Sequence, residues 1–206
     1  MKRTNKKKTP AILIPVLFIV AMLCFYLAGT AAASFRKGDD TSGEPTASME
    51  ETVRTLFDAH LDCMLHVMEL SELPYEQPSE MPQDGLVPVT DVRFPTYAAF
   101  EDYLRGIYSE QLADFYLHDF PYEGDTKYVN VDGALYLNLW LCGGKGYYVD
   151  WSDYAVAILS ESETACEFTV TASETLPAEN PAPQEYTVTG RLVKESAGWR
   201  MDTRVY

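Results

Sequence analysis

The chain has 206 residues, 47% of them apolar, and it carries 31 acidic against 16 basic side chains. A chain of this length and composition can bury one sizeable core, which excludes a protein disordered throughout and a collagen-like fibre. Its formal net charge of −15 favours neutral or basic partners and disfavours nucleic acid and anionic lipid, although the same charge also serves solubility.

The first 33 residues combine a basic start with a long apolar run. Five basic residues lie within the first eight positions, and an uncharged stretch extends from Ala11 to Ala33. We expect residues 1–33 to be either a signal peptide or a transmembrane anchor. The alanines before Ser34 suit signal peptidase, whereas the run approaches the roughly 20 residues that span a bilayer. In both cases the basic end stays in the cytoplasm and the rest lies outside the cell membrane.

Residues 34–47 are polar and interrupted by Gly43 and Pro45, which predicts a flexible linker before one folded domain at residues 48–206. That domain begins with a capping box, because Ser48 and Glu51 are three residues apart. An apolar stripe with helical spacing follows and ends before Pro74. Its members are Val53, Leu56, Phe57, His60, Cys63, Met64, Val67 and Leu70.

Prolines recur between residues 74 and 95, so we expect extended or turn conformations there rather than helix. Two short amphipathic helices are predicted next, the first capped by Thr96 and the second by Ser109. The expected buried residues of these helices are Tyr97, Phe100, Leu104, Ile107, Leu112, Phe115 and Tyr116.

From Lys127 onward the apolar period changes from helical to two, which predicts strands. Asp132-Gly133 is typical of a hairpin turn. Helices followed by an antiparallel meander indicate an α+β fold, in which the helices pack on a curved antiparallel sheet of about five to six strands. The expected strands are residues 128–131, 134–142, 154–160, 165–172, 186–194 and 199–205.

A glycine-rich segment, Gly143-Gly144-Lys145-Gly146, follows the predicted hairpin. A phosphate loop needs a serine or threonine after the lysine and a helix after the loop, and this segment has neither. We therefore expect a turn between strands, and the aromatic residues beside it favour a contact surface for a protein partner. The predicted partner-binding residues are Gly143, Gly144, Lys145, Gly146, Tyr147, Tyr148 and Trp151.

His60, Cys63 and His66 are spaced by three along the first helix, which invites a metal or nucleophile hypothesis. Two steps of three residues turn the outer pair by about 120° around the helix axis, so the spacing favours burial of His60 and Cys63 instead. Asp150 and Asp153 are interpreted as a solvated turn. We predict no metal, no cofactor and no catalytic residue, and hence no enzyme.

Beyond the apolar run the chain has only three cysteines, which is not a disulfide framework. We interpret Cys63, Cys142 and Cys166 as small buried apolar residues, and a bridge between Cys142 and Cys166 stays open as an alternative.

Four stretches of the domain carry a family resemblance: "LVPVTDVRFPTYAAFEDYLRGIYSEQLADFYL", "YVNVDGALYLNL", "GGKGYYVDWSDYAVAIL" and "YTVTGRLVKESAGWRMD". Together they resemble the IseA-type DL-endopeptidase inhibitor family. The last stretch is also similar to the wider cystatin-like and nuclear-transport-factor-like group. The resemblance implies an exported protein that restrains cysteine peptidases of the cell wall by obstructing their cleft.

The expected function is therefore an extracytoplasmic inhibitor of cell-wall DL-endopeptidases that acts by protein–protein contact, either secreted to the cell wall or anchored in the membrane. An alternative is a small-ligand-binding or interaction module of the same fold with no inhibitory role. A deep pocket lined by Tyr136, Trp140 and Phe168 would favour that alternative.

Overall fold

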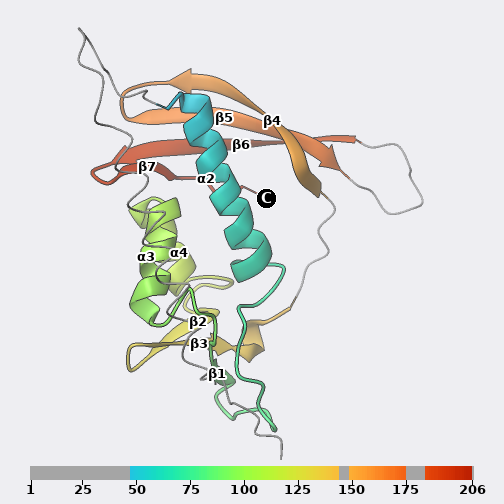
Figure 1. Cartoon of the computed structure of the whole chain (residues 1–206), viewed down its shortest axis with the longest axis vertical. Helices are drawn as coiled ribbons and strands as arrows, with labels where there is room; N and C mark the ends of the chain where they lie inside the picture. The colour runs from blue at the N-terminus through green and yellow to red at the C-terminus, as the bar shows by residue number, and fades with distance from the viewer. Residues whose placement is uncertain (1–46, 144–148, 175–183, 206) are drawn as a thin grey trace, which may run out of the picture. The chain divides into compact units, whose positions relative to one another are not determined.

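The described part of the chain, residues 47–143, 149–174 and 184–205 of a computed structural model, contains three α-helices and seven strands (Figure 1). This composition confirms the α+β class. The predicted signal or anchor segment at residues 1–33 lies outside the described residues, as does almost all of the predicted linker. None of the described helices is long and apolar enough to cross a membrane.

Helix α2 (Met49–Cys63) is the long helix expected from the apolar stripe. Its start is confirmed, because the Ser48 hydroxyl accepts a hydrogen bond from the backbone N–H of Glu51 at 3.2 Å. Val53 and Phe57 are fully buried on the face that packs against strands β4 (Val149–Glu161) and β7 (Gly198–Met201). The helix therefore supplies one side of the core.

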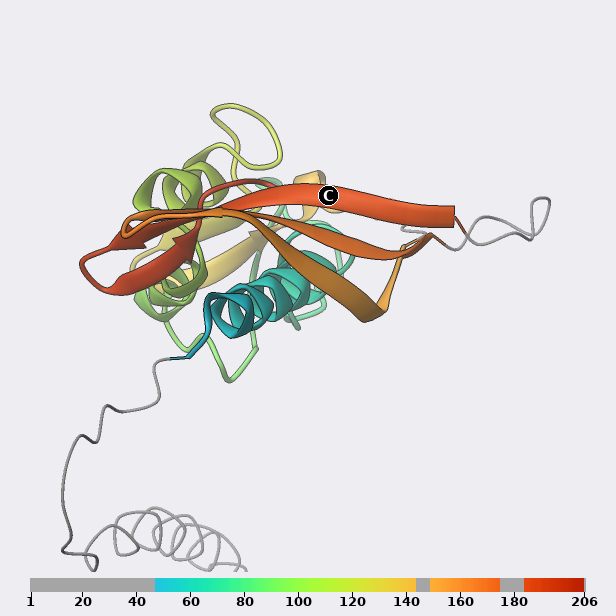
Figure 2. The same ribbon diagram turned by 90° about the horizontal axis from the view of Figure 1, so that it is seen from above.

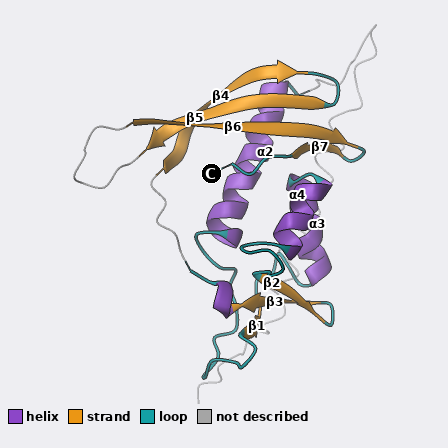
Figure 3. Ribbon diagram, turned by 180° about the vertical axis from the view of Figure 1, so that it is seen from behind, coloured by secondary structure: helices purple, strands orange, loops and turns teal. Residues whose placement is uncertain are grey.

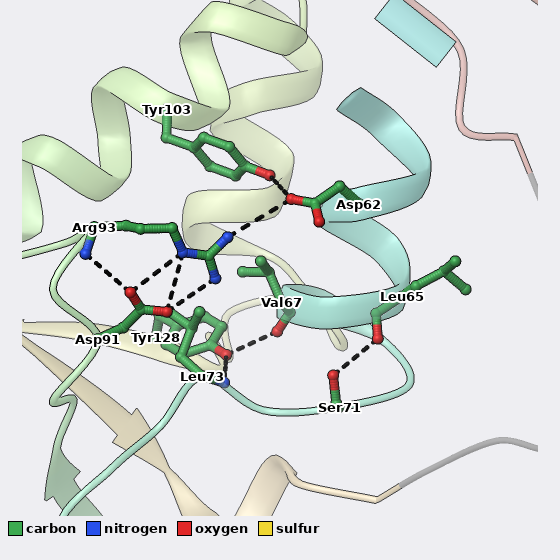
Figure 4. Close-up of polar contacts among 9 residues, drawn as sticks. All are labelled: Asp62, Leu65, Val67, Ser71, Leu73, Asp91, Arg93, Tyr103 and Tyr128. Carbon is green, nitrogen blue, oxygen red and sulfur yellow. Dashed lines mark hydrogen bonds and ion pairs between the residues drawn. The ribbon is translucent and has the colours of Figure 1, made fainter. Parts of the chain in front are cut away.

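The last turn of this helix differs from the prediction of a regular helix. Residues Met64–Met68 form a π-helical turn, η1. The carbonyl oxygens at its end are satisfied by side chains from elsewhere, since Tyr128 donates its hydroxyl to Val67 (2.7 Å) and Ser71 donates to Leu65 (2.8 Å; Figure 4). The Tyr128 hydroxyl also accepts from the backbone N–H of Leu73 at 3.0 Å.

Helices α3 (Tyr97–Ile107) and α4 (Glu110–His118) are confirmed with their predicted caps. Thr96 accepts a hydrogen bond from the N–H of Ala99, and Ser109 accepts one from the N–H of Leu112. The two helices lie side by side in Figures 1 and 3. Arg105 links them because it bonds Glu101 within α3 and Asp114 on α4, at 2.9 and 2.8 Å.

A charged network ties α2 to the segment before α3 (Figure 4). The Arg93 guanidinium bonds the Asp91 carboxylate at 2.9 Å and lies 3.7 Å from Asp62 of α2. Tyr103 of α3 donates to the same Asp62 carboxylate at 3.2 Å. The hydrogen bonds from Arg93 lower the pKa of Asp91.

The strands divide into two antiparallel sheets, rather than the single sheet that the sequence predicted. The smaller sheet has the order β1-β3-β2. In it, β1 is Leu86–Pro88, β2 is Tyr128–Val131 and β3 is Ala134–Asn138. Strand β1 was not predicted, and its proline fits an edge position. The larger has the order β4-β5-β6-β7, where β5 is Ala165–Glu174 and β6 is Gln184–Glu195. The sheets lie at opposite ends of the helices (Figures 1 and 3).

The division has a local cause at the end of β3. The sequence predicted a strand as far as Cys142, but the chain turns at Asn138 into a 3₁₀ helix, η2 (Leu139–Leu141). The N–H of Leu139 donates to the carbonyl of Gly85 at 2.8 Å, and the Asn138 side chain accepts from the N–H of Trp140 at 3.1 Å. The bond to Gly85 is the last of the β1–β3 ladder, because the N–H of Gly85 bonds the carbonyl of Pro82 (3.0 Å) instead of Leu139, and the Asn138 side chain takes the N–H of Trp140, so β3 ends early.

Strand β4 curls over α2 because it is bulged (Figure 2). Its register against β5 shifts between Asp150 and Ala155, which inserts extra residues into β4. The bulge directs Trp151 and Tyr154 toward Phe57 of α2, with ring centroids 5.3 and 5.2 Å apart. The curled sheet and the helix thus enclose a filled aromatic core.

Candidate partner-binding surface

The surface that best suits a partner lies at η2, where the chain leaves the smaller sheet on its way to the larger one. Four hydrogen bonds hold this turn. Besides the bond from Leu139 to Gly85 and the bond from Trp140 to the Asn138 side chain, the N–H of Cys142 donates to the Leu139 carbonyl at 3.4 Å, and the Cys142 thiol donates to the Asn138 carbonyl at 3.5 Å. The backbone around Trp140 is therefore fixed, although its side chain is 62% exposed.

Gly85 lets the Trp140 indole lie against the backbone. A Cβ atom at position 85 would overlap the Cδ1 and Nε1 atoms of the ring, and the φ angle of Gly85 is +71°, which favours glycine. The ring is consequently supported by a distant, earlier segment of the chain, and its remaining surface faces solvent. An exposed tryptophan with a supported ring is a preorganised contact residue.

A hollow of about 210 Å³ lies beside Trp140. Its apolar lining comes from Met68, Phe120, Pro121, Leu141 and the Trp140 ring, and Tyr122, which is 66% exposed, also borders it. Of the lining residues that the structure describes, Lys127 and Arg204 are basic and Glu69 is acidic. The hollow therefore combines aromatic walls with two cationic groups in an acidic protein.

Lys127 is the most buried charged group of the hollow, with 2% of its surface exposed. Its ammonium donates to the carbonyls of Met68 (2.7 Å) and Ser71 (3.0 Å) and lies 3.8 Å from the Glu72 carboxylate. Among the described residues, no acceptor takes its third N–H. Desolvation by burial lowers the pKa of Lys127, and the nearby Glu72 carboxylate opposes this shift.

Arg204 completes the cationic side of the hollow. Its guanidinium lies over the rings of Phe115 and Phe120, with distances of 4.6 and 5.5 Å to the ring centroids. Stacking on two aromatic faces holds an arginine in one orientation and keeps its charge beside the hollow.

The predicted partner-binding residues fall into three groups. Gly143 borders the hollow. Trp151 is 8% exposed and packs on Phe57 and Tyr186, so its indole belongs to the core rather than to the surface. Gly144, Lys145, Gly146, Tyr147 and Tyr148 lie outside the described residues.

The predicted burial of His60 and Cys63 is confirmed, and His66 is exposed. The Val205 carbonyl can only accept, so Nε2 of His60 carries the proton that it donates there, and Nδ1 accepts from the Tyr108 hydroxyl, both at 3.0 Å. Burial lowers the pKa of His60 to about 4 and raises that of Cys63 to about 12. Both groups are thus neutral structural residues.

Other residues of chemical interest are accounted for locally. The Asp150 carboxylate accepts from the N–H of Ser152, as in a turn, and His118 ends helix α4. Cys142 and Cys166 are free thiols rather than a disulfide. Desolvation raises the pKa of Cys142 to about 11, so its thiol is protonated at neutral pH. Among the described residues, no group of three His, Cys, Asp or Glu could hold a metal ion.

The three residues expected to line a ligand pocket are not together. Trp140 borders the hollow, whereas Phe168 is fully buried in the larger sheet, where its ring occupies the space above Gly190. Tyr136 is half-buried on β3. The interior beneath the curled sheet is thus filled by side chains.

Sequence reasoning missed Gly85, Lys127 and Tyr122, which shape this surface. Asp84-Gly85 is a recognisable turn signal, yet its contact with Trp140 depends on the tertiary fold. Lys127 precedes a strand and belongs to no recognisable sequence motif, so no local signal marks it.

A comparison with models of protein families finds no family that matches this chain, and a comparison with curated proteins finds no match either.

Proposed function

We propose that this chain is an extracytoplasmic protein-binding module that inhibits a cell-wall DL-endopeptidase by surface contact. The observation that carries the proposal is the preorganised Trp140. Its ring is exposed, rests on Gly85, and is presented by a backbone turn that several hydrogen bonds hold. Rigid aromatic side chains supply much of the binding energy at protein interfaces, because little conformational freedom is lost when they dock.

The inhibitory role is the finer part of the proposal, and it comes from the resemblance of the sequence to the IseA-type family. The location outside the membrane comes from the basic start and apolar run of residues 1–33. Partner binding rather than catalysis agrees with the chemistry of the described residues. His60 is neutral and sealed in the core, and the thiols of Cys63 and Cys142 have raised pKa values, so neither is an activated nucleophile.

The proposal places the contact at the surface formed by Tyr122, Trp140 and Gly143, and extends it to the predicted residues 144–148. The large negative charge of the chain would steer a basic or neutral peptidase toward it. No cofactor takes part in such a mechanism.

The test is a peptidoglycan digestion by an NlpC-type endopeptidase in the presence of the purified full chain in mild detergent. We expect cleavage to slow as the molar ratio rises, and Trp140→Ala to weaken inhibition at least about tenfold. Leu159→Ala is the matched control, because Leu159 is an exposed apolar residue (58%) on β4. Unchanged cleavage at a large molar excess of the unaltered chain would contradict the proposal.

A further inference from the structure

We propose that the outer edge of strand β4 pairs with a short extended segment of a second protein, and that this segment carries basic residues at its ends. The surface is separate from the one at Trp140, so the proposal goes beyond the proposed function and does not rest on it. Three features of the described residues carry it: an edge without a neighbouring strand, a sequence that does not block pairing, and acidic side chains without partners beside it.

Strand β4 forms one edge of the larger sheet. The strand order is β4-β5-β6-β7, and of the described strands only β5 pairs with β4. Figures 1 and 3 show no described element beyond β4 on its outer side. In an antiparallel pair, alternate residues direct their N–H and C=O groups away from the neighbouring strand. The outer edge of β4 therefore presents backbone donors and acceptors that an added strand can bond.

The regular part of this edge is short. Residues 155–158 pair in register with β5, and the register shifts on both sides of them. Before this part, the Tyr154 carbonyl already accepts a hydrogen bond from Arg54 of α2 at 3.3 Å. Because a bulge interrupts regular pairing, the edge suits a short linear segment of a partner rather than the edge of a long strand.

The sequence of the edge does not block pairing. Residues 154–160, YAVAILS, contain no charge and no proline, although exposed edges are commonly protected by one of the two. Val156 and Ile158 are half-buried and stand opposite the fully buried Val170 and Phe168 of β5. Apolar residues of an added strand, placed opposite Val156 and Ile158, would extend the same apolar layer outward.

Acidic side chains beside the edge select a basic partner. Asp153 comes just before the uncharged run and Glu161 just after it. Asp153 and Glu185 of β6 border a hollow of about 250 Å³, where residues 151–154 of β4 stand opposite the single residue Ala172. The described lining includes no basic residue, and neither of these two carboxylates has an ion pair or hydrogen bond within the described residues. A lysine or arginine of the partner can enter this hollow and pair with them.

The same charges disfavour a second copy of this chain as the occupant. If two β4 edges paired antiparallel about Ala157, Asp153 of each copy would come close to Glu161 of the other. Like charges across a strand pair are destabilising, and each copy also carries a net charge of −15. The occupant is therefore a basic segment of a different protein.

The test uses the ¹⁵N-labelled full chain in detergent and follows the backbone amide signals of residues 155–158 by NMR. The probe is acetyl-Lys-Thr-Val-Thr-Val-Thr-Lys-amide, whose valines can lie beside Val156 and Ile158 in either strand direction. The comparison peptide has glutamate in place of both lysines. We expect the lysine peptide to shift these signals saturably and to bind at least tenfold more tightly than the glutamate peptide. Equal binding, or shifts confined to other residues, would overturn the proposal.

A proline peptide separates strand pairing from attraction by charge alone. Acetyl-Lys-Thr-Val-Pro-Val-Thr-Lys-amide keeps both lysines but lacks the central N–H and has a fixed φ angle. We expect it to bind at least tenfold more weakly than the threonine peptide. If the two bind equally well, the peptides are held only by the negative charge of the chain, and the proposal is wrong.

A pair of substitutions tests the acidic hollow. Asp153→Asn together with Glu185→Gln should weaken binding of the lysine peptide at least threefold. Glu76→Gln together with Glu80→Gln is the matched control, because it removes the same charge from two exposed positions between α2 and β1. This control should change the affinity less than twofold. Equal weakening by the two pairs would show that only net charge matters, which contradicts the proposal.

Sedimentation of the full chain in detergent tests the second copy. A dimer that the lysine peptide dissociates would show that the edge belongs to another copy, and we expect none. Failure of this proposal and failure of the proposed function are distinguishable, since the two use different surfaces. A chain that binds the lysine peptide but does not inhibit the peptidase contradicts only the inhibitory role. A chain that inhibits the peptidase but does not bind the peptide contradicts only the pairing at β4.

Discussion

The indole of Trp140 occupies the space where a side chain at Gly85 would begin. The two residues are far apart in the sequence, and the hydrogen bond from the N–H of Leu139 to the Gly85 carbonyl fixes their segments side by side. Glycine at this position thus has two roles, since it allows a left-handed backbone and leaves room for an aromatic ring.

Gly85→Ala should displace the Trp140 ring. We expect a loss of about 1–3 kcal/mol of stability from the left-handed backbone, together with a changed Trp140 indole signal and weaker peptidase inhibition. Gly124→Ala is the matched control, because Gly124 has a φ of +78° and a Cβ atom added there would meet no other atom within 4 Å. Denaturant unfolding and NMR compare the two. If the Trp140 indole signal is the same in the two variants, the position of the ring does not depend on Gly85.

Stability should fall as the pH falls from about 6.5 toward 4, because of His60. Burial lowers the pKa of His60 from 6.5 to about 4, so in this interval the unfolded chain binds a proton that the folded chain does not. The stability that the neutral His60 contributes, compared with a pH below 4, is about 3 kcal/mol and is fully present above pH 6.5. Urea unfolding at several pH values measures it.

His60→Gln isolates this contribution from that of the carboxylates. The variant should be less stable at neutral pH, because it disturbs the bonds to Tyr108 and Val205, but its stability should depend less on pH between 6.5 and 4. An identical pH dependence in both proteins would show that His60 is not the titrating group.

Tyr128→Phe should destabilise the fold by about 1–3 kcal/mol, since it removes a hydroxyl that serves two buried backbone groups. The carbonyl of Val67 and the N–H of Leu73 would then lack their partner. Tyr122→Phe is the control, because the Tyr122 side chain is exposed. Thermal unfolding should separate the two variants, and equal melting temperatures would refute the bridging role of Tyr128.

Gly190→Ala should cost about 1–3 kcal/mol by overpacking, because the added methyl group meets the buried Phe168 ring across the β5–β6 pair. Phe168→Leu in the same chain should recover part of this loss. A double-mutant cycle measures the coupling, and strictly additive effects would mean that the two residues do not compete for space.

Much of the fold follows from local patterns. The Ser48, Thr96 and Ser109 caps mark helix starts that the structure confirms, because a cap depends on residues within one turn. The division into two sheets could not be predicted in this way. The alternation of leucines continues past Asn138, and the strand ends there because the N–H of the distant Gly85 bonds Pro82 rather than Leu139, and the Asn138 side chain takes the N–H of Trp140.

The candidate surface was predictable only in part. The sequence favoured a contact surface beginning at Gly143, close to Trp140. It also grouped Trp151 with the surface, whereas the bulge in β4 turns that indole into the core. Bulges and contacts between distant segments alter which way a side chain faces, and neither has a strong local signal.

The end of the first helix has a consequence for the order of folding. Its last carbonyl groups, at Val67 and Met68, receive their donors from Tyr128 and Lys127, which come much later in the chain. During synthesis, the final turn after α2 can therefore be completed only after the hairpin that follows Lys127 has been made. The first helix of the described residues is thus among the last of these elements to be completed.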